Sequence, residues 1–407
     1  MVNVIGLGYI GLPTALMLAS HGVEVIGTDY NKELIQTLQK GKITFKEDGL
    51  EQLFQEAIEG GIQFSDTYVE TDMYIVSVPT PYDKKSKKID AEYVVSAVKE
   101  ITNVCHKGSI LVIESTVSPG TIGKYVRPIL VEKGFHIGED IHIVHAPERI
   151  IPGNMVYELL HNNRTIGCDE PKIGEEVKKV YASFCKGEIV VTDIRSAEMT
   201  KVVENTFRDI NIAFANELAK ICRSDNMDVY EIIKIANKHP RVNILMPGPG
   251  VGGHCISVDP WFLVGDYPGL ANIILAARKI NDSMPEFVLE RIADIMKENG
   301  IRRASEVGLY GLTYKENVDD MRESPTLQML NCMERHLAGG LVKVYDPYIT
   351  VDMVKNQYHD LDSFLADVKL VVIMVGHDEI KESENKLADK VVLDTRCICK
   401  LHGVYHL

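Results

Sequence analysis

The residues with the clearest capacity for chemistry lie in a glycine-rich segment, PGPGVGGHCISVDP (247–260). A thiolate at Cys255 could trap an aldehyde covalently and permit a second oxidation to a thioester. The pKa of an ordinary thiol is about 8.5, so a helix N-terminus or a cation would be needed to ionise it. Bare glycines would leave room for a substrate carbon, and Asp259 could hold a water. The alternative is a glycine-rich loop around a buried cysteine, in which His254 only packs.

A second group of polar side chains shares one face of a predicted long helix, which begins near residue 196 and spans about 30 residues. Lys201 and Asn205 are four residues apart and therefore lie on the same face. Glu198 and Arg208 lie near that face. Such a stripe is either solvent-facing or part of a site, and the pattern alone leaves both interpretations open.

The first strand, turn and helix carry a dinucleotide-binding motif. GLGYIG places Gly6, Gly8 and Gly11 in the GxGxxG spacing, between a β-branched run and a helical pattern. These glycines permit a tight turn, close approach of a pyrophosphate and close helix–strand packing, with the phosphates at the helix N-terminus. Asp29 ends the second strand, where its carboxylate would accept from both ribose hydroxyls and repel the 2′-phosphate of NADP. The motif predicts NAD as the cofactor.

Three further motifs follow predicted strands, at the edge where open α/β sheets bind ligands. They are VPTP (78–81), EST (114–116) and APERIIPG (146–153), and the last contains Glu148 and Arg149. In isolation these motifs are ordinary turns or a solvated charge pair. Their shared position after strands makes them candidates for the site.

The elements that must position these residues alternate between strand and helix at both ends of the chain. Predicted strands are 2–6, 23–29, 73–79, 109–116, 141–148, 187–192, 306–312, 340–346, 370–376 and 390–395. Alternation with helices predicts an α/β fold with two doubly wound Rossmann-like domains, joined by a central all-helical region with a long connecting helix. We expect an NAD-binding domain at 1–192, a helical substrate and dimerisation domain at 193–299, and a Rossmann-like UDP-sugar-binding domain at 300–407.

Composition excludes several classes of function. A chain of 407 residues with 45% hydrophobic and 25% charged residues is typical of a soluble protein with more than one domain. Its formal charge of −14 disfavours binding of nucleic acid or an anionic membrane through a basic face. The start of the chain does not resemble a signal peptide, which predicts a cytoplasmic protein. Eight cysteines without a CxxC pair predict no structural zinc, and we expect no metal.

Seven motifs occur here in the order found in one enzyme family, the UDP-glucose/GDP-mannose dehydrogenases. They are GLGYIGLPTA, VPTP, ESTVSPGT, APER, AEMTKVVENTFRDINIAFANE, HPRVNILMPGPGVGGHCISVDPWF and GLTYKENVDDMRESP. The resemblance runs from residue 2 to about residue 330 and is most specific over 196–262 and 308–325. It implies a two-fold oxidation of a sugar C6 alcohol to a carboxylate, with two NAD⁺ and no metal.

Within this family the chain resembles the branch that oxidises UDP-N-acetyl-hexosamines. The UDP-glucose branch typically has Ser at the position of His254 and Lys at the position of Val258, whereas Ser257 stands where many members have proline. The resemblance implies UDP-N-acetyl-D-mannosamine as the substrate and UDP-N-acetyl-D-mannosaminuronate, a polysaccharide precursor, as the product. No residue visibly recognises the C2 stereocentre, so the epimer UDP-N-acetyl-D-glucosamine is the alternative, and a non-catalytic NAD-binding scaffold is the remote one.

The resemblance also implies roles for individual residues. Cys255 would be the nucleophile, Lys201 with Asn205 would stabilise the oxyanion, and Asp259 would orient water. Glu148 would act as general acid/base with Thr116 nearby. The implied cofactor-binding residues are Gly6, Gly8, Tyr9, Ile10, Gly11, Asp29, Pro79, Thr80, Thr116 and Arg322. The implied substrate-binding residues are Glu148, Arg149, Lys201, Asn205, Arg208, Arg241, Gly252, His254 and Lys315.

Two of these arginines have further implications. In the family, the arginine at the position of Arg241 tends to come from the neighbouring subunit, which implies a homodimer or a higher homo-oligomer. Arg322 either binds the cofactor or braces the inter-domain hinge. Cationic side chains at both positions suit a diphosphate.

Overall fold

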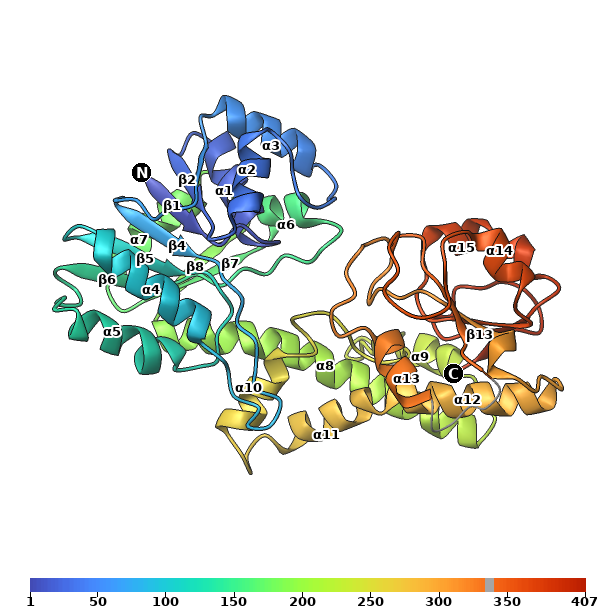
Figure 1. The fold of residues 1–407 in the computed structure, drawn as a ribbon. Helices are drawn as coiled ribbons and strands as arrows, with labels where there is room; N and C mark the ends of the chain where they lie inside the picture. The colour runs from blue at the N-terminus through green and yellow to red at the C-terminus, as the bar shows by residue number, and fades with distance from the viewer. Residues whose placement is uncertain (334–339) are drawn as a thin grey trace. The chain divides into compact units, whose positions relative to one another are not determined.

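The computed structural model describes residues 1–333 and 340–407, which form two compact units, Met1–Glu204 and Asn205–Leu407. Each unit contains one β-sheet covered by helices (Figure 1). The long helix α8 (Ile194–Ser224) begins in the first unit and ends in the second. The predicted fold class is confirmed: two doubly wound sheets are joined through a helical region with one long connecting helix.

The first unit is built on an eight-stranded sheet. In spatial order the strands are β3 (Gln63–Ser65), β2 (Val25–Thr28), β1 (Val2–Ile5), β4 (Met73–Val76), β5 (Ser109–Ile113), β6 (Ile141–His145), β7 (Arg164–Cys168) and β8 (Ile189–Thr192). The order reverses between β1 and β4, which is the switch point where doubly wound sheets bind ligands. Strands β3 and β7 were not among the predicted strands.

Strand β7 departs from the expected parallel arrangement. It pairs antiparallel with β6, with His145 opposite Gly167, and β8 then runs parallel to β7. The segment between β6 and β7 therefore stays at the edge of the sheet where β6 ends. As a result, β7 starts at the carboxyl edge of β6, and the same register continued past the strand end places Arg164 opposite Glu148.

Helices cover both faces of this sheet. They are α1 (Gly11–Ser20), α2 (Lys32–Gln39), α3 (Leu50–Glu59), α4 (Glu92–Val104), the π-helical turn η1 (Ile122–Val126), α5 (Arg127–Glu132), α6 (Met155–His161) and α7 (Pro171–Tyr181). Helices α1, α3 and α6 pack together, as do α4, η1 and α5 (Figure 1). Nine of the ten residues of α1 are buried, because this helix lies in the middle of the core.

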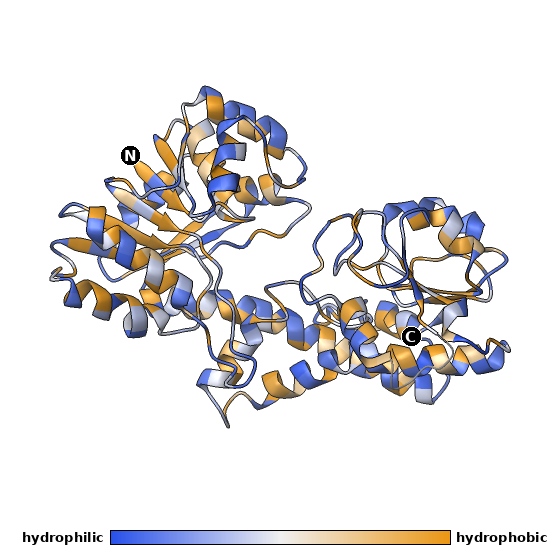
Figure 2. Cartoon of the chain, in the orientation of Figure 1, coloured by the Kyte–Doolittle hydropathy of each residue, from blue (hydrophilic) through white to orange (hydrophobic). Residues whose placement is uncertain are grey.

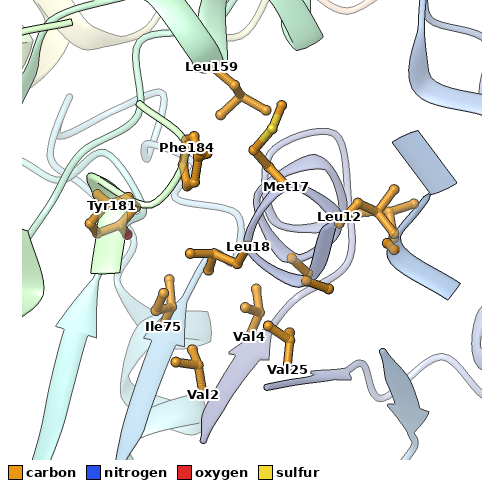
Figure 3. Close-up of a cluster of buried hydrophobic side chains, with 14 of the residues drawn as sticks. Val2, Val4, Leu12, Met17, Leu18, Val25, Ile75, Leu159, Tyr181 and Phe184 are labelled. Carbon is orange, nitrogen blue, oxygen red and sulfur yellow. The ribbon is translucent and has the colours of Figure 1, made fainter. Parts of the chain in front are cut away.

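The core of the first unit fixes the position of the glycine turn between β1 and α1. Figure 3 shows Val4, Leu18 and Ile75 meeting between the strands and α1, with Met17 and Leu159 packed on the other side of the helix. Figure 2 shows hydrophobic residues concentrated on the strands. Burial of each such side chain stabilises the fold by about 1.5–3 kcal/mol, so the turn joins two firmly held elements.

The second unit contains a six-stranded sheet in which all pairs are parallel. In spatial order the strands are β11 (Gln357–Tyr358), β10 (Lys343–Tyr345), β9 (Val307–Tyr310), β12 (Leu370–Ile373), β13 (Val391–Asp394) and β14 (Tyr405–His406). Here the switch point lies between β9 and β12. The loops after β9, β10 and β12 therefore meet at one edge of the sheet.

The helices of the second unit follow α8 in the chain. They are α9 (Val229–Ala236), α10 (Asp259–Asp266), α11 (Asn272–Asp282), α12 (Met284–Glu298), the 3₁₀ turn η2 (Ala304–Glu306), α13 (Pro325–Met333), α14 (Leu361–Ala366), α15 (Asp378–Glu382) and the 3₁₀ turn η3 (Glu384–Leu387). One hydrophobic cluster unites Ala215 and Ile292 from the helices with Leu309 of β9. None of the described helices combines the length and the apolar character needed to cross a membrane.

Candidate active site

The glycine turn in the first unit has the geometry of a pyrophosphate cradle. Gly6 has φ +88°, and a Cβ there would lie 2.5 Å from the Ser77 carbonyl oxygen. A Cβ on Gly11 would lie 1.9 Å from the Gly6 carbonyl oxygen. By contrast, no described atom comes within 4 Å of a Cβ built on Gly8. Packing therefore requires the outer two glycines, while the backbone at Gly8 faces open space where a phosphate can approach.

The carboxylate at the end of β2 is held in place by backbone amides. Asp29 accepts hydrogen bonds from the Leu7 amide at 2.8 Å and from the Asn31 amide at 2.9 Å, one on each oxygen. Each oxygen keeps a further lone pair for a ribose hydroxyl. With the glycine turn, Asp29 completes a site whose donors and acceptors fit NAD.

Two of the strand-end motifs are in direct contact. The Thr80 hydroxyl donates to the Thr116 carbonyl oxygen at 2.6 Å, and the Val78 amide donates to the Ser115 hydroxyl at 2.8 Å. Thr80 is buried and Thr116 half-buried, while Pro79 is exposed. Tyr9 and Ile10, at the start of α1, are half-buried. These residues lie after β1, β4 and β5, on both sides of the switch point.

A buried charge cluster lies where β5, β6 and β7 meet. Arg164 forms an ion pair with Glu148 at 2.5 Å, and both side chains are buried. The other oxygen of Glu148 accepts from the Arg149 amide at 2.6 Å. Glu148 is thus a fixed carboxylate rather than a solvated surface charge. Arg164 was not predicted, because only the reversal of β7 brings its side chain to this edge.

A second carboxyl group belongs to the same cluster. Glu114 accepts a hydrogen bond from the Tyr181 hydroxyl at 3.0 Å, and the Arg164 guanidinium lies 4.7 Å from the Tyr181 ring centroid. Burial, and then the charge of Glu148, raises the pKa of Glu114 to about 7. A carboxyl with this pKa can hold or release a proton near neutral pH.

Arg149 and Glu198 form ion pairs or hydrogen bonds with other residues of the first unit. The Arg149 guanidinium pairs with Glu204 at 2.7 Å and donates to the Thr165 hydroxyl at 2.8 Å. Glu198 accepts from the amides of Gly120 and Ile122, the second at 2.9 Å. Glu198 therefore stabilises the start of the η1 helix. Lys201, one turn further along α8, is buried.

In the second unit, two predicted catalytic side chains are hydrogen-bonded. The Asn205 amide nitrogen donates to an Asp259 carboxylate oxygen at 2.6 Å, and both side chains are buried. Asp259 is the first residue of α10, and its amide donates to the Cys255 carbonyl oxygen at 2.9 Å. Cys255 itself is exposed. The pair Asn205–Asp259 is thus tied directly to the backbone of the cysteine loop.

The glycines of the cysteine loop lie against an aromatic side chain from a later segment of the chain. A Cβ on Gly252 would lie 2.6 Å from Tyr314 Cβ, and a Cβ on Gly253 would lie 2.8 Å from the Tyr314 ring. The Gly253 amide also donates to the Arg322 carbonyl oxygen at 2.8 Å. The glycines make room for Tyr314 and the segment that follows it.

A buried polar network supports both ends of this loop. The Arg278 guanidinium lies 2.6 Å from Asp209 and 3.4 Å from the Ile256 carbonyl oxygen. At the other end, the Gly248 amide donates at 2.9 Å to Asn216 of α8. Neither Arg278 nor Asp209 was predicted, since their pairing joins two helices that lie far apart in the sequence.

The remaining predicted residues of the second unit differ in exposure. Arg208 and Arg241 are exposed, and Lys315 is half-buried. The Arg322 guanidinium forms a two-point contact with Asp320, with Nη2–Oδ2 at 2.6 Å. Burial, and then the charge of Arg322, lowers the pKa of His254. This shift favours the neutral form of the His254 imidazole.

Comparisons with known proteins cover nearly the whole chain. Three protein-family models of the UDP-glucose/GDP-mannose dehydrogenase family match: the NAD binding domain at 1–185, the central domain at 195–283 and the UDP binding domain at 308–401. A UDP-N-acetyl-D-mannosamine dehydrogenase of Methanococcus maripaludis is 42% identical, over 98% of this chain and 92% of its own. An NDP-N-acetyl-D-galactosaminuronic acid dehydrogenase of Ralstonia nicotianae is 40% identical, over 97% of this chain and 95% of its own.

Solved structures give the same result. The UDP-N-acetyl-mannosamine dehydrogenase Cap5O of Staphylococcus aureus has a TM-score of 0.89 at 41% identity, with 100% of this chain and 97% of that chain covered. The UDP-D-ManNAc dehydrogenase of Pyrococcus horikoshii has a TM-score of 0.91 at 34% identity, with 100% and 98% covered. The likeness therefore extends well beyond residue 330, where the motifs become sparse.

Proposed function

Because this chain belongs to the UDP-glucose/GDP-mannose dehydrogenase family and is an NAD-dependent nucleotide-sugar dehydrogenase, we propose that it oxidises the C6 alcohol of UDP-N-acetyl-D-mannosamine to the carboxylate. The observation that carries the chemistry is the hydrogen-bonded pair Asn205–Asp259, which is joined to the loop of Cys255. The names of several relatives support the choice of sugar. UDP-N-acetyl-D-glucosamine is the alternative substrate.

The proposed mechanism assigns the covalent step to Cys255. Bound NAD⁺ supplies a hydride acceptor for each of the two oxidations. Lys201 stabilises the developing charge on O6 as the alcohol becomes the aldehyde, and Glu148 takes the released proton directly or through water. The Cys255 sulfur then bonds to C6, and the aldehyde oxygen receives a proton to give a thiohemiacetal.

The second half of the mechanism returns the thiol. Loss of a hydride and a proton from the thiohemiacetal leaves a thioester on Cys255. Asp259, held by Asn205, orients a water that attacks the thioester carbon. The C–S bond breaks, the sulfur regains a proton, and the carboxylate leaves. In sum, one alcohol and one water give one carboxylate, with four electrons transferred.

An initial-rate assay with each sugar nucleotide tests the proposed substrate. We expect NADH formation from UDP-N-acetyl-D-mannosamine with a kcat/KM at least about tenfold above that for UDP-N-acetyl-D-glucosamine, a difference of about 1.4 kcal/mol in transition-state binding. Two NADH should form per sugar. UDP-glucose is the matched control, since it lacks the N-acetyl group. NADH formed only from UDP-N-acetyl-D-glucosamine would contradict the choice of sugar.

We also propose a homodimer formed through α8. Phe207, Phe214 and Ile221 recur every seven residues along this helix and are 66%, 49% and 49% exposed. A seven-residue repeat of exposed apolar side chains is the pattern of a helix that packs against a second helix. A second copy of the same helix would cover this stripe, and the family resemblance implies that Arg241 of one subunit then acts at the site of the other.

Mixing two inactive variants tests this dimer. Arg241→Ala and Cys255→Ala should each be inactive alone. If Arg241 acts across the interface, an equal, re-associated mixture should recover about a quarter of wild-type activity. About half of the dimers are then mixed, and one of the two sites in each mixed dimer is intact. As a control, Phe214→Glu is added to both variants before they are mixed. These double variants should sediment as monomers, and their mixture should recover no activity. Full activity of Arg241→Ala alone would contradict a role in trans.

A further inference from the structure

The segment 312–317, which contains Lys315, follows β9 at the switch point of the second sheet. We call it the Lys315 segment. Unusual backbone lies at both of its ends, because Gly311 has φ +102° and Asn317 has φ +58°. A Cβ on Gly311 would lie 2.6 Å from the Val375 side chain. A backbone of this kind persists only where its surroundings hold it.

One anchor of the Lys315 segment is a buried carboxylate after β10. One oxygen of Asp346 accepts from the Leu312 amide at 2.6 Å and from the Thr313 amide at 3.0 Å. The other oxygen accepts from the Tyr348 amide at 2.8 Å. Burial opposes ionisation of this group, yet the hydrogen bonds from His377 and these amides lower its pKa overall. Asp346 therefore fixes the start of the segment.

A second anchor is a buried imidazole after β12. His377 Nδ1 accepts from the Asn317 amide at 2.9 Å, which leaves Nε2 to carry the proton. Nε2 lies 3.2 Å from the same Asp346 oxygen and 3.3 Å from the Thr313 hydroxyl. The Thr313 hydroxyl in turn donates to the Lys315 carbonyl oxygen at 2.9 Å. His377 thus links both ends of the segment to Asp346 and is fully buried.

The opposite side of the same segment contacts the cysteine loop. Tyr314 occupies the space that side chains on Gly252 and Gly253 would need. The segment therefore presents Lys315 within a region that matches the family's UDP binding domain, and its neighbour Tyr314 to the backbone beside Cys255. A shift of the segment would move both.

We propose that Asp346 and His377 are positioning residues, which hold the Lys315 segment so that Lys315 binds the nucleotide diphosphate and Tyr314 supports the loop of Cys255. The proposal rests on the proposed function, because it takes a UDP-sugar as the ligand. A buried polar pair is rarely better for stability than well-packed apolar side chains. Its value here lies in the single geometry that it imposes on six residues of backbone.

Calorimetric titration with UDP alone tests the first half of the proposal. His377→Phe keeps an aromatic ring near Tyr310 and Tyr348, whose ring centroids lie 5.8 and 5.0 Å away. It removes the hydrogen bonds to Asn317, Asp346 and Thr313. We expect the Kd for UDP to rise at least about tenfold. His377→Asn restores an acceptor for the Asn317 amide and should recover part of the affinity. It also carries the test if His377→Phe fails to fold. The Kd for NAD⁺, whose predicted site lies in the other unit, should stay within about twofold of wild type.

The second half of the proposal is that Tyr314 supports the loop of Cys255. The rate at which iodoacetamide alkylates Cys255, measured by peptide-resolved mass spectrometry, tests it. In His377→Phe we expect this rate to change at least about threefold. The matched control is His359→Phe, since His359 pairs with Asp352 at 2.8 Å on the surface of the same unit. This control should leave UDP affinity and alkylation unchanged.

The outcomes separate the two proposals. Wild-type affinity for UDP in both His377 variants, or an unchanged alkylation rate in His377→Phe, would overturn the positioning role and leave the proposed substrate untouched. A wild-type protein that does not bind UDP would overturn the proposed substrate class, and the positioning role with it. Loss of UDP affinity in His359→Phe as well would show a general effect of histidine loss and would also overturn the proposal.

Discussion

In Cys255→Ser, kcat for NADH formation is expected to fall at least about 10³-fold while the Kd for NAD⁺ stays within about twofold of wild type. The reason is that a serine hydroxyl, unlike a thiol, is scarcely ionised near pH 7 and would form an ester that is a poorer intermediate for both steps. Cofactor binding should persist, since Gly6, Gly8 and Asp29 belong to the first unit and Cys255 to the second.

Single-turnover absorbance at 340 nm, with intact-protein mass spectrometry, measures this result. Wild-type protein mixed with substrate and excess NAD⁺ should show a sugar adduct on the Cys255 peptide, and the serine variant should not. Cys397→Ser is the matched control, because Cys397 is also exposed in the same unit and should be replaceable without effect. If affinity for NAD⁺ were lost together with activity, Cys255 would have a structural role rather than a chemical one.

The largest effect on stability is expected for Arg164→Met. This change leaves Glu148 without its cation in a buried cluster that also holds Glu114. Removal of one partner of a buried ion pair costs about 3–5 kcal/mol of the free energy of unfolding. Urea denaturation of the full chain, followed by far-ultraviolet circular dichroism, measures the loss. Arg127→Met breaks the partly exposed pair with Asp169 in the same unit and should cost only about 0–1 kcal/mol.

The cost of Arg164→Met should also depend on pH. Glu114 has a folded-state pKa of about 7 against an ordinary value of 4.5, so between these values the folded state holds a proton that the unfolded state has released. Its contribution to stability therefore falls as pH rises from about 4.5 to about 7. Loss of the Arg164 charge raises this pKa further. We expect a smaller cost at pH 5 than at pH 8, and an equal cost at both would show that the carboxyls are not the cause.

The parts of the site that were predictable depend on local spacing. Gly6 and Asp29 belong to a strand–turn–helix–strand unit whose geometry follows from about 30 consecutive residues. A catalytic role for Asn205 was predicted only through the family resemblance, which grouped it with Lys201, and its hydrogen bond to Asp259 was not predicted. Spacing alone left the stripe on α8 as either surface or site.

The parts that were missed depend on register and on contacts between distant segments. Arg164 reaches Glu148 because β7 runs antiparallel to β6, and hydrophobic periodicity does not encode strand direction. The glycines at 252 and 253 were expected to face a substrate. That contact stays a prediction, whereas the packing of Tyr314, about 60 residues later, was missed, because a glycine in a sequence does not show which side of its backbone is crowded. His377 lies after a strand like many other residues, and only the fold shows what it holds.

The packing of Tyr314 on Gly252 and Gly253 limits how such enzymes can recombine. The family models divide this region into a central domain that ends at 283 and a UDP binding domain that begins at 308. A chimera that joined the first part of this chain to the last hundred residues of a relative would place that relative's residue at position 314 against the two glycines. The junction of such a chimera should therefore keep the residue at position 314 and the cysteine loop from the same parent.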